Sequence, residues 1–107
     1  MQPKQIEKAT IVLKANVYFD GKVVSHTILD EAGAKKTVGL IYPGTYQFNT
    51  GDPERMDILS GSCQVKLANT VEWQQIDAGN HFNVAANSSF EIKVHSGLTE
   101  YLCTFIK

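Results

Sequence analysis

Apolar and polar residues alternate with a period of two through most of this chain, and that alternation favours an all-β fold. Between residues 44 and 50, Tyr46, Phe48 and Thr50 share one side of the expected strand. Successive side chains of a strand point to opposite faces, so such alternation is typical of half-buried strands. It recurs in residues 37–42, 56–58, 63–67, 82–84, 90–94 and 101–105. No segment shows sustained helical periodicity.

Turn signals interrupt this pattern at short intervals. They lie at residues 20–21, 32–33, 43–44, 51–53, 60–61, 78–79, 87–88 and 96–97. Short strands at such spacing predict a closed or double-sheet architecture, a barrel or jelly roll. The chain has 107 residues, which is enough for one core, and we expect one barrel domain over residues 16–107. Residues 1–15 are expected to form an arm, in which residues 11–13 could add a strand.

Composition limits the classes of partner. The net charge is −1 and the charged residues are scattered, so neither nucleic acid nor an anionic membrane surface is an expected partner. The longest apolar run is too short to span a bilayer, and the first residues lack a signal-peptide cleavage site, so we expect a cytoplasmic protein. Cys63 and Cys103 lie far apart in strand-like segments. They are expected to be buried and unpaired, rather than a disulfide or a metal pair.

Residues 43–61 carry the first recognisable motif. They read as Pro-Gly, a strand, a short loop, then Glu54, six residues and Gly61. This layout resembles the first motif of the cupin barrels. In metal-binding cupins the strand carries two histidines at alternate positions, and here those positions hold Phe48 and Thr50.

Residues 79–90 resemble the second cupin motif. Ala85 stands at the family's proline, Asn87 at its glycine and Phe90 at its histidine. Asn is a reasonable replacement for that glycine because it tolerates a positive φ better than most residues. Of the usual ligands only Glu54 remains, and one carboxylate does not make a transition-metal site. The histidines lie on separate segments, at His26, His81 and His95, and no bound metal is expected.

The resemblance narrows when further blocks are added. Residues 17–23, 37–39, 43–61, 79–84 and 101–103 occur in order together with Trp73. This combination resembles the small single-domain pyrimidine/purine nucleoside phosphorylase family, over Asn16 to Ile106. The resemblance implies a cupin (RmlC-like) jelly-roll β-barrel, a homodimer and an enzyme without a cofactor. It implies cleavage of the N-glycosidic bond of purine and pyrimidine nucleosides by inorganic phosphate, which gives ribose 1-phosphate and free base with broad base specificity.

Glu54 and Tyr46 are the expected catalytic residues. Burial in an apolar barrel should raise the pKa of Glu54, which suits a general acid, whereas its carboxylate form would bind ribose hydroxyls or stabilise developing positive charge. The alternative is a loop glutamate paired with Arg55 or a lysine. The Tyr46 hydroxyl is expected to donate to phosphate or to the leaving base, unless Tyr46 is an ordinary core tyrosine.

The remaining candidates bind substrate. Flat apolar walls stack any base, since every base has a π-face. The substrate-binding residues are expected to be Phe48, Thr50, Met56, Phe90 and Tyr101. The alternatives are a plain core for the apolar side chains and a strand-closing role for Thr50. Lys22 and Arg55 are the expected phosphate ligands because they lie within or beside the family-like blocks, whereas Lys35-Lys36 is expected to be a solvated turn.

Two other functions stay open at this point. One is a non-catalytic cupin that binds a small molecule or sugar. The other is a metal-dependent cupin enzyme with unusual ligands, which the replaced histidines disfavour.

Overall fold

A computed structural model describes residues 2–106, and within them eleven strands form two antiparallel sheets. The larger sheet has the order β1-β3-β4-β11-β6-β9, with β2 also paired to β3, and the smaller has the order β5-β10-β7-β8. The larger contains β1 (Thr10–Ile11), β2 (Asn16–Tyr18), β3 (Val23–Leu29), β4 (Lys35–Ile41), β6 (Glu54–Ser60), β9 (His81–Val84) and β11 (Thr99–Phe105). The smaller contains β5 (Gly44–Asn49), β7 (Ser62–Leu67), β8 (Gln74–Asp77) and β10 (Ser89–Val94), and a 3₁₀ turn, η1, covers Phe19–Gly21. The all-β prediction is confirmed.

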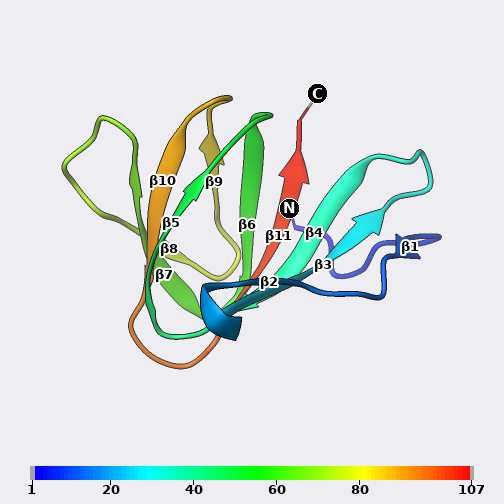
Figure 1. The fold of residues 1–107 in the computed structure, drawn as a ribbon, viewed down its shortest axis with the longest axis horizontal. Helices are drawn as coiled ribbons and strands as arrows, with labels where there is room; N and C mark the ends of the chain where they lie inside the picture. The colour runs from blue at the N-terminus through cyan, green and yellow to red at the C-terminus, as the bar shows by residue number, and fades with distance from the viewer. Residues whose placement is uncertain (1, 107) are drawn as a thin grey trace.

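The two sheets face each other and enclose the core. Figure 1 shows the smaller sheet on one side of the molecule and the larger on the other, with the ends of β3 and β4 extending away from the smaller sheet. Strand β10 illustrates the packing: Phe90, Ile92 and Val94 are buried, while the residues between them are half-buried. Burying an aliphatic or aromatic side chain of this size contributes about 1.5–3 kcal/mol. The alternation that predicted the strands therefore also supplies the apolar faces that hold the sheets together.

The two motif blocks meet at one end of the sandwich. The amide of Thr50 donates to the carbonyl of Ser88 at 2.9 Å, and the amide of Asn87 donates to the carbonyl of Gly51 at 3.0 Å. The Thr50 hydroxyl donates to the carbonyl of Ala85 at 2.6 Å. Asn87 has a φ of 51°, the positive value expected at this motif position. These contacts fix the loop that leads into Glu54.

The N-terminal arm lies against the larger sheet. The Gln2 side-chain amide donates to the carbonyls of Ile58 and Asn80, both at 3.0 Å. Further along the arm, β1 pairs antiparallel with residues 28–29 of β3. None of the described helical segments is long and apolar enough to cross a bilayer.

Candidate functional site

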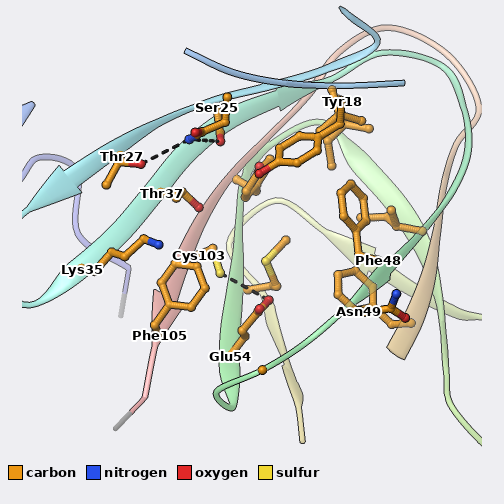
Figure 2. Close-up of a pocket in the computed structure, with 18 residues that line it drawn as sticks. Tyr18, Ser25, Thr27, Lys35, Thr37, Phe48, Asn49, Glu54, Cys103 and Phe105 are labelled. Atoms are coloured by element: carbon orange, nitrogen blue, oxygen red, sulfur yellow. Dashed lines mark hydrogen bonds between the residues drawn. The ribbon is translucent and has the colours of Figure 1, made fainter. Parts of the chain in front are cut away.

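A cavity of about 360 Å³ lies between the sheets, within the range of small-molecule sites. Both sheets contribute to its wall, and Figure 2 shows Phe48 of the smaller sheet across the cavity from Thr37 and Lys35 of the larger. The lining residues are Asn16, Tyr18, Val23, Ser25, Thr27, Lys35, Thr37, Ile41, Phe48, Asn49, Gly51, Glu54, Met56, Phe90, Ile92, Tyr101, Cys103 and Phe105.

Strand register arranges the large-sheet side of the cavity in rows. Tyr101 of β11 lies opposite Gly39 of β4, and Cys103 lies opposite Thr37. On its other side β11 pairs Cys103 with Met56 and Phe105 with Glu54 of β6. Side chains two apart on a strand share a face, so Tyr101, Cys103 and Phe105 all face the cavity. Their paired neighbours Thr37, Met56 and Glu54 extend these rows across the lining.

Aromatic rings form the small-sheet side. Phe48 and Phe90 are directly paired across β5 and β10, and their rings stack with centroids 5.7 Å apart and an angle of 26°. The ring of Tyr18 meets Phe48 edge-on at 5.9 Å. Phe90 is buried whereas Phe48 is half-buried, so part of the Phe48 ring remains open. This wall can stack a flat heteroaromatic ring.

Hydroxyl and amide groups form the opposite wall. The Asn16 amide donates to the hydroxyls of Ser25 and Thr27, each at 3.2 Å, as Figure 2 shows. Tyr101 is buried near them, and burial raises its pKa to about 12, against the opposing effect of a hydrogen bond with Ser25. The phenol therefore stays protonated at neutral pH and can donate. Such a wall suits the hydroxyls of a sugar.

Glu54 is the one carboxylate that lines the cavity among the described residues. It is half-buried, and burial raises its pKa; the nearby Asp52 adds to the rise, while a hydrogen bond from Cys103 opposes it. That bond runs from the Cys103 thiol to Oε1 of Glu54 over 3.5 Å. Burial and the carboxyl of Glu54 raise the pKa of the Cys103 thiol, so it remains a donor. A carboxyl with a raised pKa beside a cavity can act as a general acid.

Five of the nine residues expected at the site line this cavity. They are Glu54, Phe48, Met56, Phe90 and Tyr101. Tyr46 and Thr50 do not line it, and both are buried. The Tyr46 hydroxyl donates to the carbonyls of Tyr42 at 2.8 Å and Pro43 at 3.0 Å. The Thr50 hydroxyl is engaged with the main chain of the second motif, so both hydroxyls hold turns.

The two expected phosphate ligands also lie outside the cavity lining. Arg55 follows Glu54 on β6 and so takes the opposite face of the strand, where its guanidinium pairs with the buried Asp57 at 3.3 Å. Lys22 is exposed at the end of η1. Lys35, expected in a solvated turn, is exposed but begins β4 and lines the cavity.

Sequence reasoning missed most of the polar lining. Asn16, Ser25, Thr27 and Thr37 come from β2, β3 and β4. The available signal was the alternation itself, because Ser25 and Thr27 are in phase with the buried Val23. A search limited to apolar residues passes over such a face.

The described residues show no metal centre. No group of three or more His, Cys, Asp or Glu side chains in residues 2–106 is placed to hold a metal ion. Cys63 and Cys103 are free and buried, as expected.

Comparison with known proteins finds a family model and relatives that share one description. The family model described as pyrimidine/purine nucleoside phosphorylase matches residues 13–105. A protein of that name from Cupriavidus necator is 49% identical over 105 residues, which covers 98% of this chain and 99% of the relative. One from Methylobacillus flagellatus is 50% identical over 101 residues, covering 94% and 97%.

Solved structures agree on the fold. A protein of unknown function from Acinetobacter superposes with a TM-score of 0.92 at 41% identity, covering 95% of this chain and 98% of the other. Oxalate decarboxylase from Bacillus subtilis gives a TM-score of 0.74 at 10% identity, covering 97% of this chain and 30% of that one. The second likeness concerns the fold alone. It supports the cupin-like arrangement predicted from the motifs, here as two facing sheets without hydrogen-bonded closure in the described residues.

Proposed function

Since this chain belongs to the pyrimidine/purine nucleoside phosphorylase family and is an enzyme of that kind, we propose that it cleaves the N-glycosidic bond of purine and pyrimidine nucleosides with inorganic phosphate. The products are ribose 1-phosphate and the free base. The observation that carries the proposal is the position of Glu54, a half-buried carboxyl in the same cavity as the stacked rings of Phe48 and Phe90.

The cavity supports broad base specificity. A base stacked on Phe48 is held by its face, and stacking is tolerant of base identity. The Asn16 amide nitrogen, a group able to recognise a base edge, instead donates to the hydroxyls of Ser25 and Thr27. Met56 completes the apolar lining. The hydroxyl wall with Tyr101 then faces the sugar, the part that all nucleosides share.

Glu54 supplies the chemistry. A phosphate oxygen forms the bond to the anomeric carbon while the electron pair of the carbon–nitrogen bond leaves with the base. Protonated Glu54 donates its proton to the departing base, and dihydrogen phosphate returns one to Glu54. One nucleoside and one dihydrogen phosphate thus give one base and one ribose 1-phosphate monoanion. A raised pKa keeps a larger share of Glu54 protonated near neutral pH.

We also propose an oligomeric state, a cellular location and a cofactor requirement for this enzyme. The family resemblance supports a cytoplasmic homodimer that needs no cofactor beyond phosphate as co-substrate. Light scattering measures the mass, and a monomer in dilute solution would contradict the dimer.

A turnover assay tests the reaction. Purified protein is incubated with uridine or adenosine, with and without phosphate, and free base and ribose 1-phosphate are quantified. We expect both products from both nucleosides only when phosphate is present. A non-catalytic cupin would bind nucleoside and release no base, and phosphate-independent release would indicate hydrolysis. Either result would contradict phosphorolysis.

A further inference from the structure

Lys35 carries the positive charge in the cavity lining. Among the lining residues of the described chain, Lys35 and Glu54 alone are formally charged at neutral pH. The ammonium of Lys35 lies over the face of the Phe105 ring, 4.9 Å from its centroid, and forms no ion pair with an acidic side chain of residues 2–106. An aromatic face holds a cation in place without neutralising it. The charge is therefore available to a ligand.

Hydroxyl groups lie beside this ammonium. Thr37 follows Lys35 on the same face of β4, and Thr27 of β3 is directly paired with Thr37. Figure 2 shows the Lys35 side chain directed toward Thr37 and Cys103. The effect of the ammonium reaches the cavity, because it lowers the pKa of the Cys103 thiol against the larger effect of burial.

We propose that Lys35, together with the hydroxyl of Thr37, binds the inorganic phosphate that attacks the nucleoside, an inference that rests on the proposed phosphorolysis. A lysine ammonium is a compact charge that binds phosphate through charge-assisted hydrogen bonds. The threonine hydroxyl adds an uncharged hydrogen-bond donor beside the positive charge of the ammonium.

The position of Lys35 relative to Glu54 fits an attack on the anomeric carbon. Phe105 is paired with Glu54 across β6 and β11, and the Lys35 ammonium lies over the same ring. The two charged groups are thus on either side of Phe105. The Lys35 ammonium attracts phosphate to its own end of the cavity, whereas protonated Glu54 at the other end carries no charge that would hold the anion. The sugar then lies between the phosphate and the carboxyl that protonates the base.

Steady-state kinetics with matched variants test this assignment. We expect Lys35→Gln to raise the KM for phosphate by about tenfold or more while the KM for uridine changes less than about twofold. Lys35→Arg should restore most of the affinity for phosphate. Lys36→Gln is the control, since Lys36 is the next residue, carries the same charge and does not line the cavity. An unchanged KM for phosphate in Lys35→Gln, or an equal rise in Lys36→Gln, would overturn the assignment.

Equilibrium dialysis with radiolabelled phosphate separates this inference from the proposed reaction. Wild-type protein without nucleoside should bind phosphate, and Lys35→Gln should lose that binding. If wild type binds phosphate through Lys35 yet releases no base, the binding site stands and the proposed reaction fails. If wild type releases base and the two proteins bind phosphate equally, the site fails and the reaction stands. The last measurement uses uridine 5′-monophosphate as the ligand. If this nucleotide binds in a Lys35-dependent way and free phosphate does not bind, the site is one for the phosphate of a nucleotide and the assignment to inorganic phosphate is overturned.

Discussion

The thiol of Cys103 donates a hydrogen bond to a carboxyl oxygen of Glu54 at 3.5 Å. The two residues lie diagonally on the paired strands β11 and β6, where Cys103 is opposite Met56 and Glu54 is opposite Phe105. Burial raises the pKa of Glu54, and this hydrogen bond opposes the rise. Because the thiol holds one carboxyl oxygen in place, the hydrogen bond also orients the carboxyl, as the proposed general acid requires.

Glu54→Gln should abolish most of the turnover. Glutamine keeps the size of the side chain and removes the proton that the base receives. Loss of general acid catalysis costs about 10²–10⁴-fold in rate, and we expect kcat to fall by at least about 100-fold with little change in KM for uridine. Circular dichroism should show an unchanged fold. Turnover near that of wild type would remove Glu54 from catalysis.

Cys103→Ala should move the pH profile. The lost hydrogen bond lowered the pKa of Glu54, so its removal raises that pKa. Activity that requires protonated Glu54 is lost as pH rises through this pKa, and the alkaline limb of kcat should therefore shift to higher pH. Cys63→Ala, also a buried cysteine but outside the cavity lining, is the control and should leave the limb in place. A shift to lower pH would contradict the role of the bond.

Glu54 should also make stability depend on pH. Its pKa in the folded state is above the ordinary 4.5, so folding favours the protonated form and the folded state loses stability as pH rises through the raised pKa. At pH 7 Glu54→Gln should therefore have a larger free energy of unfolding than wild type. The difference should vanish below pH 4.5. Urea unfolding at several pH values measures it, and a variant less stable at pH 7 would contradict the argument.

The sequence predicted the strands best where one face meets an apolar core. Phe90, Ile92 and Val94 alternate cleanly and are all buried in β10. Strand β3 was not predicted, because its inward positions include Ser25 and Thr27, which line the cavity instead of the core. Hydrophobic periodicity detects a strand by its apolar positions, so it misses a strand such as β3, whose cavity-facing positions carry hydroxyl groups.

The site was predictable only in part for a related reason. Motif spacing located Glu54, Phe48 and Phe90, which do line the cavity. The place of Lys35 in the cavity lining, instead of the solvated turn expected for it, depends on strand β4, whose long-range pairing with β11 no local pattern encodes. Tyr46 has the alternation of a cavity residue, yet its hydroxyl reaches two carbonyls of the preceding turn, which depends on the backbone path at residues 42–44.

Gly39→Ala should destabilise the fold and disturb the wall of hydroxyl and amide groups near Tyr101. A Cβ at Gly39 would meet the carbonyl oxygen of Val24 at 2.5 Å and Tyr101 Cε1 at 3.0 Å. The first neighbour is backbone, so the strands would have to shift, and we expect a loss of about 1–3 kcal/mol of stability with a higher KM for uridine. Gly51→Ala controls for the stability effect, since open space surrounds its Cβ position. Equal stability of the two variants would show that the close packing is not needed.

Tyr46→Phe separates a structural hydroxyl from a catalytic one. The hydroxyl donates to the carbonyls of Tyr42 and Pro43, and its loss leaves both without this partner. We expect a loss of about 1 kcal/mol of stability, and a kcat within about twofold of wild type because Tyr46 does not line the cavity. Thermal unfolding and initial rates with uridine at saturating phosphate measure the two effects. A kcat reduced about 100-fold in a fully folded variant would support the catalytic role expected from the sequence, since proton donation is worth at least that much.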